Sequence, residues 1–266
     1  VAKFGLFSCD VAPLSSAPAL AFELGVESLQ QVLQVYSREA NPVEWARAQA
    51  TLGNAYRCRT IDTAAGVVAS DQEAAIRCYE EALQVETREA HPAQWFHTQV
   101  NLGLVYRDRI NGDAASNAEV SIRYFERALE VGTREAKPHV WASLQAHLGD
   151  SHRFRAAGDA GLNTEEAIRY YEQALQAYSP PTEASAVAWA TTWVKVGQAY
   201  QVLLRGDIVA HKEASIYCYK QAVKVNTRTA RPEPWAQIQQ HLGHAYNSRI
   251  SGDMGSNKEE AIRYFT

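Results

Sequence analysis

Histidine and cysteine side chains are the groups in this chain whose types could support metal binding or catalysis. His241 and His244 are three residues apart, which would place both imidazoles on one helix face, as in a metal-binding pair. No Cys, Asp or Glu in the same helix completes a ligand set. Cys58 lies near an expected helix C-terminus, where the helix dipole disfavours a thiolate nucleophile. With no glycine-rich phosphate loop and no Ser-His-Asp set in the sequence, we expect no catalytic residue, metal or cofactor, and no enzyme activity.

Arginines recur at two fixed places and could supply electrostatic chemistry. One series, Arg57, Arg107 and Arg153, follows a repeated glycine by four residues. A second series lies two residues further on, and in three cases an aspartate follows it by four residues. We interpret this second series as structural ties between a helix end and a loop. Its members are Arg59, Arg109, Arg155 and Arg249, and the aspartates are Asp113, Asp159 and Asp253.

A tryptophan that recurs every 46 to 50 residues shows which elements must position these groups. Each tryptophan is followed eight residues later by a glycine, and a period of this length is typical of a repeat array. In such an array each unit packs its apolar face on its neighbours. We expect the tryptophans to pack between consecutive units and the glycines to let two helices approach closely. The positions are Trp45, Trp95, Trp141, Trp189 and Trp235, with Gly53, Gly103, Gly149, Gly197 and Gly243.

Each unit reads as two antiparallel helices joined by a short loop. The first helix has a proline in its first turn and apolar or small residues at helical spacing, and Asn41 with Glu44 has the form of a capping box. The second helix is expected to begin near Asn117, Asn163 or the equivalent residue of each unit. Asn163 with Glu166, and Asn257 with Glu260, have capping-box spacing. The sequence therefore predicts an all-α protein.

The residues of these units resemble the tetratricopeptide repeat (TPR) family. Leu52-Gly53, Tyr56, Ala75, Tyr79 and Ala82 fall in the family's order, and the other units match at the equivalent positions. The units are longer than the usual 34 residues, and this Trp-led version looks most like the arrays of bacterial proteins that carry a caspase-like CHAT peptidase. The resemblance implies an α-solenoid of antiparallel helix pairs, wound as a right-handed superhelix.

The resemblance also implies that the first helices line a concave groove that binds a peptide or a partner domain. The expected peptide- or partner-binding residues are Arg47, Asn54, Arg57, His97, Asn101, Arg107, His147, Asp150, Arg153, Lys195, Gln198, His241 and His244. Arginine and lysine outnumber acidic residues on these rows, whereas the second helices carry many glutamates. We therefore expect a mildly basic groove and an acidic ligand. The other possibility is that the arginine row is a solvated face without a ligand.

Asn54 and Asn101 also match two asparagines of the carboxylate clamp by which some members of the family grip chaperone C-termini. Ala50, Ser143 and His147 occupy the clamp's basic positions, however, so three of its five positions differ. This departure argues against chaperone-tail binding. A further alternative function is a sensor array that regulates an effector domain, such as a CHAT-type peptidase, absent from this fragment.

The expected organisation is an N-terminal cap or degenerate helix over residues 1–20, then a TPR-like solenoid of about five helical-hairpin repeats over residues 21–266. The first helices are expected near residues 42–59, 92–109, 138–155, 186–204 and 232–249, and the last repeat is expected to be truncated. Exposed ends of such an array could stack copies of the chain, so self-association is a further possibility.

Composition limits the class of partner. The net charge of −4 argues against a nucleic-acid binder, and no stretch is long enough to span a membrane. The four cysteines lack paired spacing, which favours reduced thiols in a cytoplasmic protein over a disulfide framework. We therefore expect a protein or peptide ligand in the cytoplasm.

Overall fold

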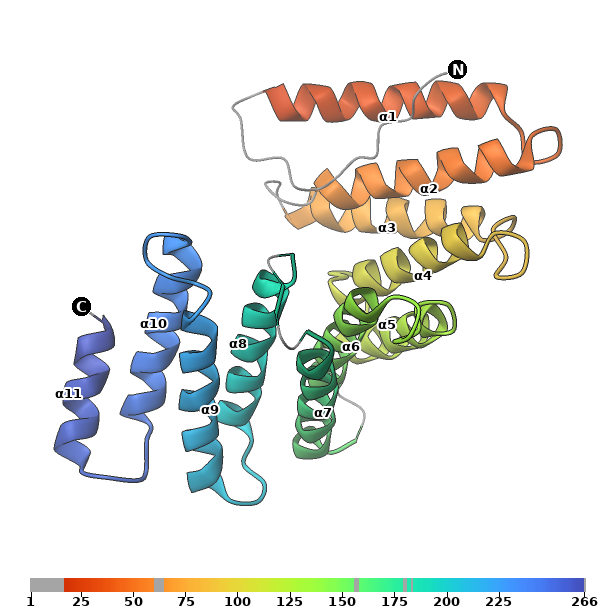
Figure 1. The fold of residues 1–266 in the computed structure, drawn as a ribbon. Helices are drawn as coiled ribbons and strands as arrows, with labels where there is room; N and C mark the ends of the chain where they lie inside the picture. Colours follow the sequence, from red (N-terminus) through yellow and green to blue (C-terminus); the bar gives the residue numbers. More distant parts are fainter. Residues whose placement is uncertain (1–16, 60–64, 156–157, 179–180, 183, 266) are drawn as a thin grey trace. The chain divides into compact units, whose positions relative to one another are not determined.

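The computed structural model describes residues 17–59, 65–155, 158–178, 181–182 and 184–265, and all regular elements in these ranges are α-helices (Figure 1). The chain divides between Val131 and Gly132 into two compact units. The expected cap over residues 1–20 lies mostly outside the described residues, and a single array over residues 21–266 stays a prediction.

Among the described residues the first unit contains five helices, and the second contains six. The second unit consists of three antiparallel helix pairs, and the first unit consists of α1 followed by two such pairs. The bounds in the first unit are α1 Ala17–Val35, α2 Pro42–Cys58, α3 Ala65–Ala82, α4 Pro92–Arg107 and α5 Ala114–Leu129. Those in the second unit are α6 Pro138–Arg153, α7 Ala160–Tyr178, α8 Ala186–Val202, α9 Ile208–Val223, α10 Pro232–Asn247 and α11 Met254–Phe265.

The first helices α2, α4, α6 and α10 begin with the proline that the sequence pattern singles out. Proline suits this position because a backbone N–H in the first turn has no partner within the helix, so nothing is lost when proline lacks it. The capping box expected at Asn41 and Glu44 is absent, since the Asn41 side chain makes no capping hydrogen bond. Instead, a Ser or Thr orders the turn before the helix, four residues ahead of the cap residue. Before α4, for example, Thr87 Oγ1 accepts a hydrogen bond from the Ala90 N–H at 3.1 Å.

Four second helices, α5, α7, α9 and α11, begin three residues before the expected position, because an aspartate after a glycine caps each of them. Gly112 has φ +84°, a conformation that only glycine adopts freely, and Asp113 then accepts from the Ser116 N–H at 2.8 Å. The capping boxes predicted at Asn163 and Asn257 are therefore wrong. Both asparagines lie inside their helices, buried, and donate back to loop carbonyls at 2.8 Å.

A glycine facing an aromatic ring sets the closeness of each helix pair. A Cβ on Gly149 of α6 would lie 2.5 Å from Cε1 of Tyr171 on α7, and the other pairs repeat this contact. The two helices therefore do approach closely at the glycine, as expected. However, the glycine contacts an aromatic ring of the partner helix and not its backbone. The glycine–ring pairs are Gly53–Tyr79, Gly103–Phe125, Gly149–Tyr171, Gly197–Tyr219 and Gly243–Phe265.

Five tryptophans lie half-buried near the starts of the first helices. The guanidinium of Arg134 lies 5.3 Å from the ring centroid of Trp141, and that of Arg228 lies 5.5 Å from that of Trp235. Both arginines come from the connection before the helix, so these rings hold the connection against the helix start by a cation–π contact.

Candidate functional site

The expected groove positions lie on one run of elements in each unit, which we call the first-helix face. It comprises α2 and α4 in the first unit and α6, α8 and α10 in the second. Arg47, His97 and His244 are exposed, and Asp150 is buried. The remaining expected groove residues are half-buried, namely Asn54, Arg57, Asn101, Arg107, His147, Arg153, Lys195, Gln198 and His241.

In the first unit the two asparagines of the face contact each other. Asn101 on α4 donates from Nδ2 to Oδ1 of Asn54 on α2 at 2.8 Å. The same oxygen accepts from the hydroxyl of Tyr79 at 2.8 Å. Because Tyr79 is fully buried under Gly53, the core fixes the orientation of the Asn54 amide from below.

In the second unit an ion pair occupies the equivalent place. Nζ of Lys195 on α8 lies 2.6 Å from Oδ2 of Asp150 on α6, and the Tyr171 hydroxyl donates to Oδ1 of Asp150 at 2.8 Å. His147 Nδ1 lies 4.0 Å from the same carboxylate. Asp150 therefore gathers a cation, a hydroxyl and an imidazole around one buried carboxylate.

The next pair along the second unit is Gln198 on α8 and His241 on α10. Their Nε2 atoms lie 3.2 Å apart, and Arg153 on α6 donates to Oε1 of Gln198 at 3.3 Å. The His241 ring stacks on Tyr219 with centroids 5.2 Å apart. Burial lowers the pKa of His241, and the neighbouring His244 lowers it further, so the imidazole is neutral near pH 7.

These contacts follow one rule, which defines what we call the polar ladder. The residue after each repeat glycine contacts the residue two places before the next repeat glycine. Its three described rungs are Asn54–Asn101, Asp150–Lys195 and Gln198–His241. Sequence alignment placed these residues on one face, but it did not predict that they pair with one another.

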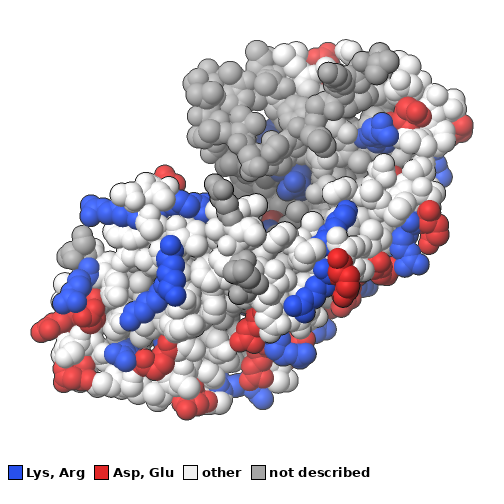
Figure 2. All heavy atoms as spheres, viewed as in Figure 1, with Lys and Arg blue, Asp and Glu red and all other residues white. Residues whose placement is uncertain are grey.

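Pairing reduces the basic excess expected on the first-helix face. Arg107 donates to the carboxylate of Asp108 at 2.8 and 2.7 Å, and Asp150 offsets Lys195. Asp108 was missed because it lies outside the rows that the resemblance assigns to the groove. On the side of the molecule seen in Figure 2, basic and acidic side chains are interspersed among uncharged ones. A strong separation of charge between faces therefore stays a prediction.

The second arginine series ties helix ends as expected, but to different partners. Arg109 pairs with Glu73 on α3, with both contacts at 2.8 Å, and Asp113 caps α5 instead. Arg249 likewise pairs with Glu213 on α9, and this pairing lowers the pKa of Glu213. The aspartate four residues on is unsuitable as a partner because it already accepts from the backbone at the helix start.

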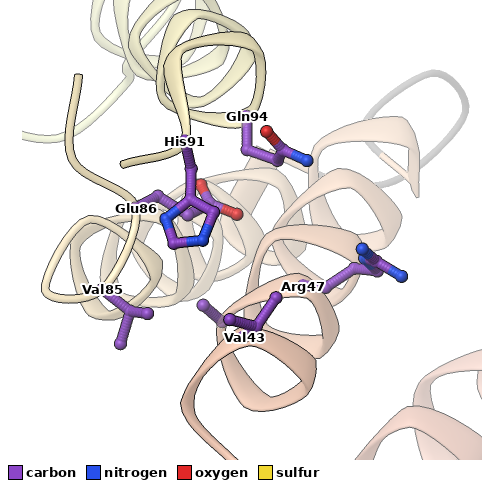
Figure 3. A pocket seen from close by; sticks show the side chains of 7 residues that line it. Val43, Arg47, Val85, Glu86, His91 and Gln94 are labelled. Carbon is purple, nitrogen blue, oxygen red and sulfur yellow. The ribbon is translucent and has the colours of Figure 1, made fainter. Parts of the chain in front are cut away.

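A small cavity of about 10 Å³ lies beside Glu86 in the first unit, with room for about one water molecule (Figure 3). Arg47 comes from α2, while Glu86 and His91 come from the connection between α3 and α4. Glu86 is only 4% exposed and accepts from Thr98 Oγ1 at 2.7 Å. Burial raises the pKa of Glu86, and the bond from Thr98 offsets only part of this effect.

Within the described ranges no group of three His, Cys, Asp or Glu residues could hold a metal ion, and no helix there is long and apolar enough to cross a membrane. Cys78 and Cys218 are buried free thiols, and burial raises their pKa values to about 11 and about 12. Cys58 is disulfide-bonded, so the expectation of a reduced thiol is wrong at this position.

Comparisons with known proteins find likeness at the level of structure. No family model matches the chain, and no curated protein matches it in sequence. The crystal structure of BtubC (BKLC) from P. vanneervenii superposes with a TM-score of 0.63 at 16% identity, covering 92% of this chain and 88% of that one.

A second similar structure is a putative kinesin light chain from Podosopora anserina with nearly identical TPR-like repeats. It gives a TM-score of 0.55 at 16% identity and covers 82% of this chain and 90% of that chain. The resemblance to CHAT-linked arrays stays a prediction. The helix pairs, the recurring glycine–ring contact and these superpositions together show that the chain has the TPR-like fold, an all-α solenoid of antiparallel helix pairs.

Proposed function

We propose that this protein is an interaction scaffold whose first-helix face binds an extended segment of a partner protein. The polar ladder is the observation that carries the proposal. Its amide, carboxylate and imidazole groups sit on neighbouring first helices, are held in place from the core, and are in part open to solvent. Preorganised polar groups cost little ordering entropy when a ligand binds.

The asparagine rung suits the backbone of an extended peptide. Oδ1 of Asn54 already accepts from Tyr79 and Asn101, so in this proposal Asn54 serves the ligand through the two N–H donors of its amide. Oδ1 of Asn101 supplies an acceptor beside them. A peptide unit carries one donor and one acceptor, so the rung can engage the main chain whatever the side-chain sequence.

We further propose that the ligand is acidic, and that this preference is mild. Arg47, Arg57 and Arg153 place positive charge on the face, whereas Arg107 and Lys195 share theirs with Asp108 and Asp150. Exposed ion pairs contribute about 0.2–1 kcal/mol each. Removing three of these charges should therefore weaken binding of an acidic peptide by about tenfold at low salt.

Fluorescence anisotropy with a labelled Asp/Glu-rich peptide of about 12 residues tests this function. The variant Arg57→Ala/Arg107→Ala/Arg153→Ala should lose about tenfold in affinity, and wild-type binding should weaken with salt. The matched control, Arg77→Ala/Arg123→Ala/Arg169→Ala, removes the same charge from exposed positions on second helices. Equal loss in both triple variants would mean that net charge alone attracts the peptide.

The asparagine rung is tested separately with Asn54→Leu. Leu104 and Phe125 occupy the same places in the next repeat, so the variant also carries Tyr79→Phe, which leaves no buried hydroxyl without its acceptor, and Tyr79→Phe alone is the control. The substitution should weaken both the acidic peptide and an uncharged peptide of the same length, because it removes contacts to the main chain. Unchanged affinity for both peptides would refute the role of this rung.

A further inference from the structure

A buried carboxyl group adjoins the small cavity that is lined from α2, from the α3–α4 connection and from α4. Glu86 is 4% exposed, and Thr98 Oγ1 donates to its Oε2 at 2.7 Å, which leaves Oε1 to accept from a ligand. Burying an ionisable group that is only partly hydrogen-bonded costs stability. Since such groups gather at functional sites, Glu86 is a candidate for ligand recognition.

The equivalent place in the second unit shows what can lie over a buried acceptor here. Asn226, in the connection between α9 and α10, is the equivalent of Glu86 and is 3% exposed. Arg231, the equivalent of His91, donates from Nη1 to Oδ1 of Asn226 at 3.1 Å. Beside Glu86 the shorter His91 side chain takes the place of this arginine and lines the cavity. This precedent favours a cationic group as the occupant of the cavity.

The polar side chains of the cavity match the donors of a lysine. Glu86, His91 and Gln94 all line it (Figure 3). His91 Nδ1 is buried and has no hydrogen-bond partner among the described residues. It is an acceptor when the imidazole is neutral with its proton on Nε2. The carboxylate, the imidazole and the Gln94 amide then supply three acceptors, and a lysine ammonium carries three N–H donors and no acceptor.

Size and the apolar lining favour lysine over arginine. The cavity has room for about one water molecule, which an ammonium head resembles in size, whereas a planar guanidinium is larger. Val43, Ala46 and Val85 form the apolar part of the lining, where the aliphatic stem of a lysine can pack. Arg47 also lines the cavity, but it is exposed and its guanidinium points away from Glu86 (Figure 3).

We infer that the cavity beside Glu86 is a subsite for a lysine side chain of the partner protein. The inference rests on the proposed function, because Arg47 belongs both to the cavity lining and to the first-helix face. In this subsite Glu86, His91 and Gln94 accept hydrogen bonds from the ammonium, and the bond to Glu86 is charge-assisted. The preferred ligand is then an acidic segment that also carries a lysine.

Nuclear magnetic resonance with a blocked lysine, Nα-acetyl-lysine N-methylamide, tests the subsite on the 266-residue chain. Titration should shift the side-chain signals of His91. Glu86→Gln should weaken binding by about tenfold or more, because it removes a charge-assisted hydrogen bond. Glu44→Gln is the matched control, since it removes the same charge from an exposed position on α2 and should change the affinity by less than about twofold.

Analogues of the probe identify what the cavity recognises. The norleucine and Nε-acetyl-lysine analogues lack the charge and the arginine analogue has a larger head, so each should bind at least about tenfold more weakly than the blocked lysine. Equal binding of the lysine and norleucine analogues would overturn the inference, as would equal losses in the two variants. An unchanged His91 signal would overturn it as well, by showing that the cavity takes water only.

The blocked lysine also separates this inference from the proposed function. It contains no acidic residue, so its binding does not depend on the arginines of the first-helix face. If the acidic peptide binds and the blocked lysine does not, the subsite is wrong and the proposed function is unaffected. If the blocked lysine binds and the acidic peptide does not, the cavity takes lysine but the proposed acidic ligand is wrong.

Discussion

Substitution of Gly149 by alanine tests the physical basis of the helix pairs. The added Cβ would lie 2.5, 2.7 and 3.0 Å from three ring carbons of Tyr171. These distances fall as much as about 1 Å short of an ordinary carbon–carbon contact. The ring is fully buried and held at its hydroxyl by Asp150, so it has no free direction in which to move.

The expected cost follows from two opposing effects. Overpacking a well-packed core costs about 1–3 kcal/mol, and three short contacts with an immobile ring place this case near the upper end. Alanine offsets about 1 kcal/mol of this cost through its better helix propensity. The net loss in the free energy of unfolding is therefore about 2 kcal/mol.

Urea denaturation followed by far-ultraviolet circular dichroism measures this loss. Gly66→Ala is the matched control, because nothing lies within 4 Å of the added Cβ and the variant should gain up to about 1 kcal/mol. In a Tyr171→Leu background, Gly149→Ala should cost far less, because leucine fills the equivalent place at Leu29. A Gly149→Ala protein as stable as the wild type would refute the reasoning.

Two further predictions concern single polar groups. Burial raises the folded-state pKa of Glu86, so this group destabilises the fold as pH rises from its unfolded pKa of about 4.3 through the raised folded value. The Glu86→Gln variant should therefore be more stable than wild type at pH 7 and equally stable below about pH 4. The exposed Glu27→Gln is the control. Denaturation at several pH values measures this, and a stability difference independent of pH would contradict it. Asp113→Ala should cost about 1 kcal/mol by removing the cap of α5, whereas Asp113→Asn should cost much less, and equal losses would point to charge instead of capping.

Sequence periodicity predicted the fold well because the repeated residues carry large packing effects. Glycine opposite an aromatic ring and proline at a helix start each have one physical use, so their recurrence located α2, α4, α6 and α10 at the correct first residue. Helix caps were predicted less well. Asn163 and Asp159 are both good capping residues four positions apart, and only the loop conformation at Gly158 decides between them.

The contacts within the first-helix face were not predicted, and its role in binding stays a prediction. Side chains such as Lys195 and Asp150 come from neighbouring repeats, and their pairing depends on how two helices are offset, which a single sequence does not reveal. Glu86 was missed as well. Its place is taken by Tyr178 and Asn226 in other repeats, so the periodic pattern carries no signal there.

Photo-crosslinking most directly tests whether the first-helix face is the binding surface. A photoreactive amino acid would replace His97 or Gln237, which are exposed on α4 and α10, and in parallel Arg123 or Tyr217, which are exposed on α5 and α9. With the acidic peptide bound, we expect crosslinks from positions 97 and 237 and none from positions 123 and 217. Crosslinks from the second helices alone would contradict the proposed function.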